Sequence, residues 1–203
     1  MLTRKEKKTA LRNQIVDSAA IYSANLAGKT FLYIYGNDYF EVSFKTECFL
    51  HLTGVETALS ARSFYSKAKN RTLGDGQFFF SKTHPYDTAK RKLDYLPRLP
   101  ELTTTRVNIL NDLKTPTLIY SVGMTNFEFT LGLAENTTAT GKTIYTPRTF
   151  RIKDNPEKIS AKCVPADYIL CKDASNDKYK IVLVGKEGVG LTDLQKLFVE
   201  VFL

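Results

Sequence analysis

Residues 31–44 read FLYIYGNDYFEVSF, and this stretch is the strongest indication of how the chain folds. Two runs rich in aromatic and β-branched residues, 31–35 and 39–44, flank the turn residues 36–38 (Gly-Asn-Asp). Such turn residues between two extended runs are typical of a β-hairpin, because they tolerate the positive φ angles of a tight turn. The stretch therefore predicts two paired antiparallel strands.

Helical periodicity surrounds this hairpin. Before it, a helix is predicted over residues 5–27, with Gly28 as its C-cap, from apolar residues spaced by three or four: Leu11, Ile15, Ala19, Tyr22 and Leu26. After it, small and aromatic residues at helical spacing predict a helix over about residues 56–70. A short helix is expected over residues 87–96, ended by Pro97.

The second half of the chain alternates extended runs with turns. Strands are predicted at residues 117–122, 127–133, 143–145, 149–152, 168–170 and 179–184. Residues 97–116, polar and flanked by prolines, carry the weakest pattern, and a short helix over residues 191–202 closes the chain. The predicted fold class is α+β, with N-terminal helices packed on an antiparallel β-sheet arranged as a meander and a short C-terminal helix.

Composition restricts the classes of protein that fit. A chain of 203 residues, 43% of them hydrophobic, fits one domain with or without an appendage and is not disordered. No apolar run approaches the roughly 18 residues that span a bilayer, and the N-terminus lacks the apolar centre of a secretory signal. Three widely spaced cysteines suit a reducing compartment, so we expect a cytoplasmic protein without membrane contact. Their spacing does not fit a structural zinc site.

Positive charge is unevenly distributed along the chain. The net charge is +8, from 29 Lys and Arg against 21 Asp and Glu. Residues 1–12 carry five basic side chains against one acidic one, and residues 61–72 and 142–153 each carry four basic side chains and no acidic one. If these segments converge on one face, that face would attract a polyanion such as nucleic acid. The alternative is a set of solvated surface charges.

His51 is the first candidate for chemistry, since the chain has only two histidines. It stands beside Thr53 at a predicted junction between a strand and a helix, where backbone N–H groups at a helix N-terminus favour phosphate. Imidazole is also the side chain best suited to proton transfer near neutral pH. The alternative is a half-buried structural histidine, with Thr53 and Glu56 forming only a helix capping box.

A second candidate segment follows Pro147. Arg148, Thr149 and Arg151 stand on an extended stretch, where they could hold a phosphodiester through charge-assisted hydrogen bonds. The alternative is an exposed strand edge guarded by arginines. The aromatic run at residues 78–80 is interpreted as a buried anchor rather than a platform for base stacking. The chain contains neither a phosphate-binding P-loop nor histidines and carboxylates at metal-ligand spacing, so no metal and no cofactor is expected.

The hairpin, followed by Phe49-Leu-His51-Leu-Thr53-Gly54-Val55, resembles a phage-associated branch of the barnase–EndoU–colicin–RelE-like nuclease superfamily. In that branch an aromatic hairpin, an F-x-H-L-T-G motif and a helix with an F-Y pair, here Phe64-Tyr65, recur. Pro147-Arg148-Thr149 matches a later P-x-[ST] element. The resemblance is specific over residues 30–70 and looser up to 155. It implies a nuclease-like domain over residues 1–155 and a C-terminal extension, 156–203, packed on the same domain.

The resemblance also implies roles for individual residues. His51 would be the general acid or base, Thr53 would bind phosphate or orient His51, and Tyr65 would be a second proton donor. The scissile phosphate would be held by Arg148 and Thr149. Further substrate contacts would come from basic side chains: Arg62, Lys67, Arg71, Lys142 and Arg151. We expect His51 and Arg148 to share one concave site, with about 4–8 Å between their polar tips.

Two functions follow as hypotheses. The first is a phage- or prophage-derived RNase-like effector, a hydrolase that cleaves host RNA in the bacterial cytoplasm without metal, by attack of the 2′-hydroxyl group. Such cleavage needs a base, an acid and a cation near the phosphate. The second is a non-catalytic phage protein on the same fold that binds nucleic acid, or a host or phage protein, and inhibits host defence. An acid–base pair in one cleft would distinguish them.

Overall fold

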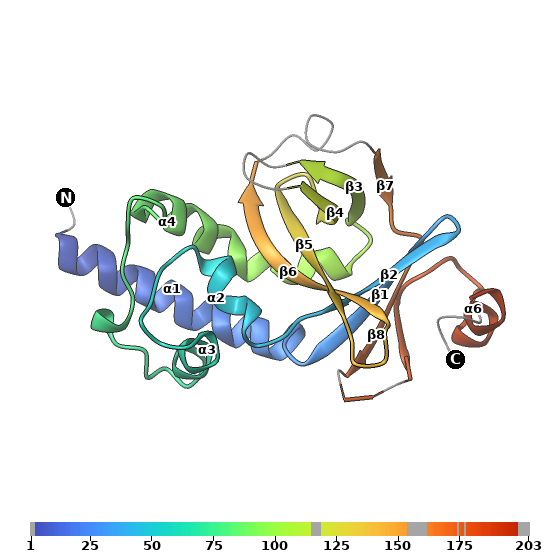
Figure 1. The fold of residues 1–203 in the computed structure, drawn as a ribbon, viewed down its shortest axis with the longest axis horizontal. Coiled ribbons are helices and arrows are strands. Elements are labelled where there is room, and N and C mark those ends of the chain that lie inside the picture. The colour runs from blue at the N-terminus through green and yellow to red at the C-terminus, as the bar shows by residue number, and fades with distance from the viewer. Residues whose placement is uncertain (1–2, 115–118, 154–161, 174, 177, 199–203) are drawn as a thin grey trace.

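The structure is a computed structural model and describes residues 3–114, 119–153, 162–173, 175–176 and 178–198. The helices of the first half of the chain gather at one end of the molecule, and a curled nine-stranded sheet forms the other part, with a short C-terminal helix at its far side (Figure 1). The predicted α+β class is confirmed: helices come first, the sheet is mainly antiparallel, and a short helix lies near the C-terminus. Within the described residues, no helix combines the length and apolar character needed to cross a membrane.

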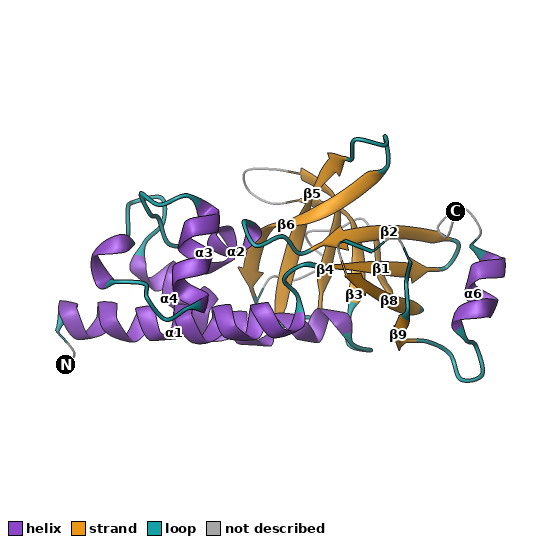
Figure 2. Ribbon diagram, turned by 90° about the horizontal axis from the view of Figure 1, so that it is seen from below, coloured by secondary structure: helices purple, strands orange, loops and turns teal. Residues whose placement is uncertain are grey.

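The first helix lies alongside both parts of the molecule (Figure 2). The helices are α1 (Arg4–Asn25), α2 (Cys48–Thr53), α3 (Ala61–Lys69), α4 (Tyr86–Tyr95) and α6 (Leu191–Leu197), with 3-10 helices η1 (Asp75–Gln77) and η2 (Leu96–Thr103). α1 begins with a capping box between Thr3 and Glu6. It contacts α3, α4 and η2 through the predicted apolar face, whose five residues are all buried. The helix predicted from periodicity is therefore confirmed.

The predicted hairpin lies near the middle of the sheet. The strands are β1 (Lys29–Tyr35), β2 (Asp38–Ser43), β3 (Asn108–Lys114), β4 (Ile119–Thr125), β5 (Phe129–Thr137), β6 (Thr143–Ile152), β7 (Lys162–Pro165), β8 (Tyr168–Asp173) and β9 (Ile181–Val184). Their order is β7-β3-β4-β5-β6-β2-β1-β8-β9. β1 and β2 pair from Thr30 with Ser43 to Tyr35 with Asp38, which confirms the hairpin. β3 to β6 form an antiparallel meander, and β6 meets β2 in parallel at Tyr145 and Val42.

Some predicted elements are wrong in extent. The helix expected over residues 56–70 begins only at Ala61, because the backbone of Glu56 instead pairs with Phe79 in an isolated β-bridge and Ser60 caps the helix. The helix expected over 87–96 ends at Tyr95, and the prolines that follow continue as η2. The two runs expected at 143–145 and 149–152 form one strand, β6.

Two strands, β3 and β7, were not predicted from the sequence. β3 lies within the weakly patterned segment 97–116, where polar residues interrupt the buried Ile109, Leu110 and Leu113. β7 has only four residues and extends the sheet beside β3. Of the predicted elements, residues 117–118 of one strand and 199–202 of the last helix lie outside the described residues. β7, β8 and β9 join the same sheet as the earlier strands, while the division of the chain at residue 155 stays a prediction.

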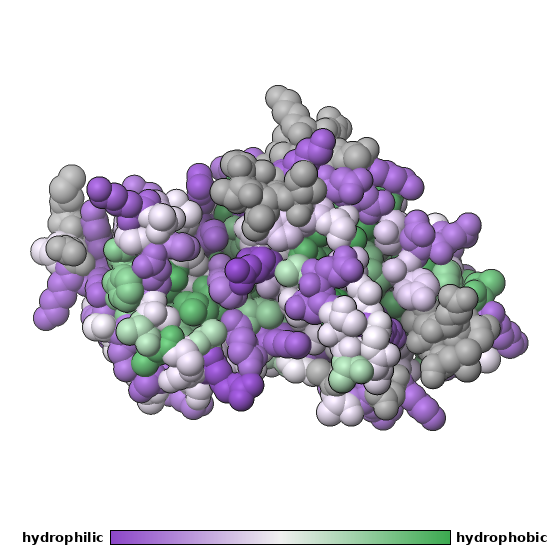
Figure 3. All heavy atoms as spheres, viewed as in Figure 1, coloured by the Kyte–Doolittle hydropathy of each residue, from purple (hydrophilic) through white to green (hydrophobic). Residues whose placement is uncertain are grey.

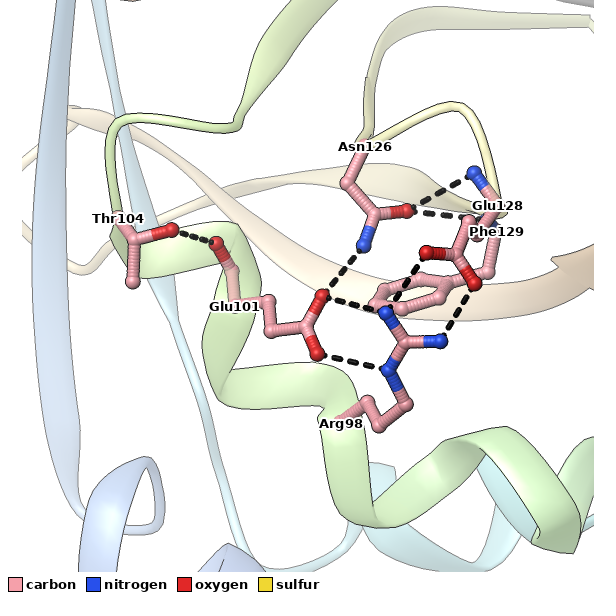
Figure 4. Close-up of polar contacts among 6 residues, drawn as sticks. All are labelled: Arg98, Glu101, Thr104, Asn126, Glu128 and Phe129. Carbon is pink, nitrogen blue, oxygen red and sulfur yellow. Dashed lines mark hydrogen bonds and ion pairs between the residues drawn. The ribbon is translucent and has the colours of Figure 1, made fainter.

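A polar cluster fastens η2 to the turn between β4 and β5 (Figure 4). The guanidinium group of Arg98 donates to both carboxylate oxygens of Glu101, at 2.7 and 3.0 Å, and also binds the carboxylate of Glu128. The side chain of Asn126 donates to Glu101 and accepts from the backbone N–H groups of Glu128 and Phe129. These bonds fix the proline-containing segment that connects the helices to the sheet.

A buried carboxylate links β2 to the late part of the chain. Glu41 is 3% exposed and accepts a hydrogen bond from the hydroxyl group of Tyr179. Its oxygens lie 3.0 Å from Nζ of Lys142 and 3.3 Å from Nζ of Lys172. Burial by itself would raise the pKa of Glu41, but the hydrogen bonds and the two ammonium charges outweigh burial and lower it.

Candidate active site

His51 lies in the last turn of α2, the short helix that follows β2. One face of the helix packs into the core through Cys48, Phe49 and Leu52, whereas His51 is exposed. Gly54 ends the helix with a φ of 75°, a left-handed conformation that glycine adopts without steric cost. The expected helix N-terminus beside His51 is therefore wrong, since His51 stands at a C-terminal end where carbonyl groups and not N–H groups are free.

Thr53 has a structural position. Its side chain is fully buried, and its hydroxyl group donates to the carbonyl of Leu50 at 2.7 Å. The same oxygen accepts from the N–H group of Val55 at 3.4 Å. Thr53 thus stabilises the end of α2 and does not cap a following helix, so the predicted capping box with Glu56 is wrong.

A pocket of about 430 Å³ opens beside His51. Five parts of the chain surround it: the end of α2 with the residues after it, the segment that leads into α4, α4 itself, and the strands β4 and β6. Its polar lining residues include His51, Glu56, Thr57, His84, Lys92, Tyr120, Arg148 and Thr149. The pocket therefore brings together three of the predicted site residues, His51, Arg148 and Thr149.

Arg148 contacts His51 from a β-bulge in β6. Gly132 of β5 pairs with Thr149 and Leu133 pairs with Pro147, so that Arg148 is the extra residue of a β-bulge. Bulges re-aim a side chain and are common beside active sites. Nη1 of Arg148 lies 3.2 Å from Nε2 of His51, a direct contact shorter than the 4–8 Å that we expected. In this contact the guanidinium N–H donates, and Nε2 accepts with its lone pair.

The second histidine enters the same pocket, which the sequence analysis missed. Nδ1 of His84 lies 2.7 Å from Oε1 of Glu56. The hydroxyl groups of Ser81 and Thr83 donate to the same oxygen. These hydrogen bonds, that of Ser81 foremost and that of His84 next, lower the pKa of Glu56. A carboxylate at Nδ1 fixes the tautomer of an imidazole and leaves Nε2 as the nitrogen that exchanges protons.

Positive charge surrounds His51. Although His51 reaches the surface, partial burial of its imidazole lowers its pKa from the usual 6.5, and the neighbouring Arg148, Lys92 and His84 lower it further. The imidazole of His51 is therefore neutral at physiological pH. Lys92 also lines an adjoining pocket of about 250 Å³ together with Thr149, Arg91 and Arg151. Burial lowers the pKa of Lys92, and the charges of Arg151 and Arg91 act in the same direction.

Tyr65 lies in the helical core and not at the pocket. It is 5% exposed, and its ring packs edge-on against Tyr22 and Phe49, with centroids 5.9 and 5.5 Å apart. The F-Y pair of α3, Phe64 and Tyr65, therefore packs against Phe49 of α2 in the core. The pocket instead holds His84 beside His51.

Four of the five predicted substrate contacts lie away from the pocket. Arg62 pairs with Glu47 before α2, Arg71 pairs with Asp17 of α1, and Lys142 pairs with Glu41. Lys67 is half-buried on α3. Of the five predicted contacts, only Arg151 stands beside the pocket, in the adjoining one. In the described part of the chain, no cluster of three or more His, Cys, Asp or Glu side chains is arranged to hold a metal ion.

Replacing Gly54 with alanine should disturb the pocket through Lys92. A Cβ atom there would lie 2.8 Å from Cδ of Lys92, in a backbone conformation with φ of 75°. We expect a loss of about 1–2 kcal/mol in unfolding free energy from the backbone conformation and a rise in the pKa of His51 as the ammonium group moves. Gly28→Ala is the control, because φ is 73° there and no atom lies within 4 Å of the new Cβ. Urea unfolding and NMR titration of His51 would show whether the two variants differ in the pKa, and equal pKa values would contradict this prediction.

Comparison with curated proteins and with solved structures gives no match to this chain. In a comparison with protein families, residues 14–198 match the family described as phage-Barnase-EndoU-ColicinE5/D-RelE like nuclease4. The match covers most of the helical part, the pocket residues and all nine strands, and it agrees with the resemblance carried by the hairpin and the F-x-H-L-T-G segment. The chain belongs to this family of phage nuclease-like proteins.

Proposed function

We propose that this protein is an endoribonuclease that cleaves RNA without a metal ion, in the pocket shared by His51, His84 and Arg148. Membership of the family supports a phage nuclease-like function in general. The observation that carries the finer proposal is that one pocket holds two imidazoles and a guanidinium group. These supply the base, the acid and the cation that attack by a 2′-hydroxyl group requires.

The surroundings of the two histidines suggest how the roles divide. His51 has a lowered pKa and is neutral, so its Nε2 is the base that removes the proton from the 2′-hydroxyl group. The Glu56 carboxylate contacts Nδ1 of His84 and orients the ring, so we assign its Nε2 as the donor of a proton to the leaving 5′-oxygen. Arg148, now against His51, turns to the phosphate and stabilises the charge of the pentacovalent transition state.

In this reaction the bond from O2′ to phosphorus forms as the bond from phosphorus to O5′ breaks. One proton moves to His51 and another leaves His84, so charge and atoms balance. The products are an RNA end with a 2′,3′-cyclic phosphate and an RNA end with a free 5′-hydroxyl group. We further propose that the substrate is host RNA in the cytoplasm of a bacterial cell.

A single-turnover assay with excess chelator tests this proposal. We expect cleavage of single-stranded RNA, products with 2′,3′-cyclic phosphate, and no cleavage where the attacking 2′-hydroxyl group is replaced by hydrogen. Arg148→Ala should weaken both RNA affinity and rate, because a phosphate contact acts in the ground and transition states alike. Arg62→Ala is the matched control, since Arg62 pairs with Glu47 away from the pocket. RNA binding without cleavage would favour the non-catalytic alternative, and cleavage of the 2′-deoxy substrate would overturn the mechanism.

A further inference from the structure

A second pocket, of about 490 Å³, lies directly beside the candidate active site. It is lined by Lys7, Lys8, Phe79, Phe80 and Tyr86. Phe79 lines the candidate active site as well, so the two pockets meet at this side chain. On the face shown in Figure 3, hydrophobic side chains reach the surface at the helical end of the molecule, bordered by hydrophilic ones.

The aromatic run at residues 78–80 divides into two roles. Phe78 is fully buried, as expected for an anchor, and its ring packs edge-on against Phe80, which in turn packs against Tyr86 at 5.4 Å. Phe79 is 44% exposed. Its backbone exchanges two hydrogen bonds with Glu56, at 3.0 and 2.8 Å. An exposed ring on a firmly held backbone is a suitable surface for stacking, because little freedom is given up on binding.

Two cations accompany these rings. Nζ of Lys7 lies 5.9 Å from the ring centre of Tyr86, and Nζ of Lys8 lies 5.2 Å from that of Phe78. No acidic residue is among the described residues that line this pocket. Aromatic faces next to unopposed ammonium groups are the combination by which proteins hold single-stranded nucleic acid, through base stacking and contacts to phosphate.

We propose that this second pocket binds the nucleotide on the 3′ side of the cleaved phosphate, with its base stacked on Phe79 and its own 3′-phosphate near Lys7 and Lys8. The proposal rests on the proposed ribonuclease function for its substrate. The side is assigned by connectivity: Phe79 is bonded to Glu56, and Glu56 holds His84, the donor to the leaving 5′-oxygen. A base can stack here only when it is unpaired, so the subsite selects single-stranded RNA.

Binding of uncleavable oligonucleotides tests this subsite independently of catalysis. The oligonucleotides carry 2′-deoxy sugar at the cleavage position and the fluorescent base 2-aminopurine either 3′ or 5′ of it. We expect quenching of the 3′ probe alone, and loss of that quenching with about tenfold weaker binding in Phe79→Ala. Phe79→Tyr should restore both. The control is Phe127→Ala, which removes an aromatic ring that is 56% exposed and lines neither pocket.

The outcomes separate the two proposals. Quenching of the 3′ probe that depends on Phe79 supports the subsite even if the protein cleaves no RNA. Quenching that survives in Phe79→Ala, equal quenching of both probes, or no binding of either probe would overturn the subsite, whether or not the protein cleaves RNA. Replacing Lys7 and Lys8 together by alanine should lower the slope of log affinity against log salt by about 0.7 for each phosphate that these lysines neutralise. An unchanged slope would remove these lysines from the subsite.

Discussion

Replacing His51 with alanine is expected to slow RNA cleavage by about 10²–10⁴-fold, the usual contribution of a positioned proton-transfer group. RNA affinity should stay nearly unchanged, because the imidazole acts mainly in the transition state. His51 suits this role because its pKa is lowered and its Nε2 lies in the pocket, 3.2 Å from Nη1 of Arg148. Single-turnover rates at saturating protein, together with affinities for an uncleavable RNA, measure the two effects separately. Cleavage that is as fast in His51→Ala as in the unmodified protein would remove His51 from the mechanism.

A substrate with a reactive leaving group distinguishes the base from the acid. A uridine 3′-aryl phosphate releases a phenolate that needs no proton, so His84→Ala should cleave it almost as fast as the unmodified protein does. His51→Ala should remain slow on it, because the 2′-hydroxyl group must still lose its proton. If the two variants exchange these behaviours, the roles of His51 and His84 are reversed.

The pH dependence of the cleavage rate also tests whether His51 is the base. A base works in its neutral form, so the rate should fall as pH drops through the pKa of His51, which burial and the nearby cations place below the usual 6.5. Removing one of those cations in Arg148→Ala should raise the pKa of His51 and move this acidic limb to higher pH. An acidic limb that stays in place would show that Arg148 does not act on the group that titrates.

Replacing Glu41 with alanine is expected to cause the largest loss of stability, about 3 kcal/mol in unfolding free energy, near the lower end for a broken buried ion pair. The variant leaves the Lys172 ammonium and the Tyr179 hydroxyl without their carboxylate, while Lys142 can reach water. Urea unfolding measures the effect. Asp17→Ala is the matched control, because its ion pair with Arg71 is exposed on both sides and should contribute at most about 1 kcal/mol. Equal losses in the two variants would contradict a special role for Glu41.

The contribution of Glu41 should depend on pH with a defined sign. Folding lowers the pKa of this carboxyl group below its usual 4.5, so the unfolded chain takes up its proton first as the pH falls. The stabilisation is therefore fully present above about pH 4.5 and is lost below it, down to the lowered pKa. The difference in stability between the unmodified protein and Glu41→Ala should shrink in the same range.

Local patterns were sufficient for the hairpin, the first helix and three members of the pocket. The apolar spacing of α1 and the turn at residues 36–38 specify their elements through neighbouring residues alone. His51, Arg148 and Thr149 were predicted from two short motifs that lie together in the fold. The direct contact between Arg148 and His51 was not predictable, because it depends on a bulge whose position is set by pairing between β5 and β6.

The acid of the proposed pair could not be predicted for a different reason. His84 and Glu56 are 28 residues apart in the sequence, and their contact depends on the β-bridge between Glu56 and Phe79. An isolated bridge of this kind leaves no periodic pattern in the sequence from which it could be predicted. The one signal in the sequence was that His84 is the chain's only other histidine. Tyr65 shows the reverse case, since a motif position suggested chemistry while packing against Tyr22 and Phe49 makes it part of the core.

The order of strands has a consequence for protein synthesis. β1 is flanked by β2, which follows at once, and by β8, where Cys171 pairs with Phe31 across a separation of 171 − 31 = 140 residues. Synthesis runs from the N-terminus, so His51, His84 and Arg148 are made before β8. At that stage one edge of β1 has no partner strand, and Glu41 lacks its partners Lys172 and Tyr179. Contacts between such distant residues form late. A ribosome that has not yet made β8 therefore holds a chain whose sheet is incomplete, and we expect activity to begin only after β8 has been made and has paired with β1.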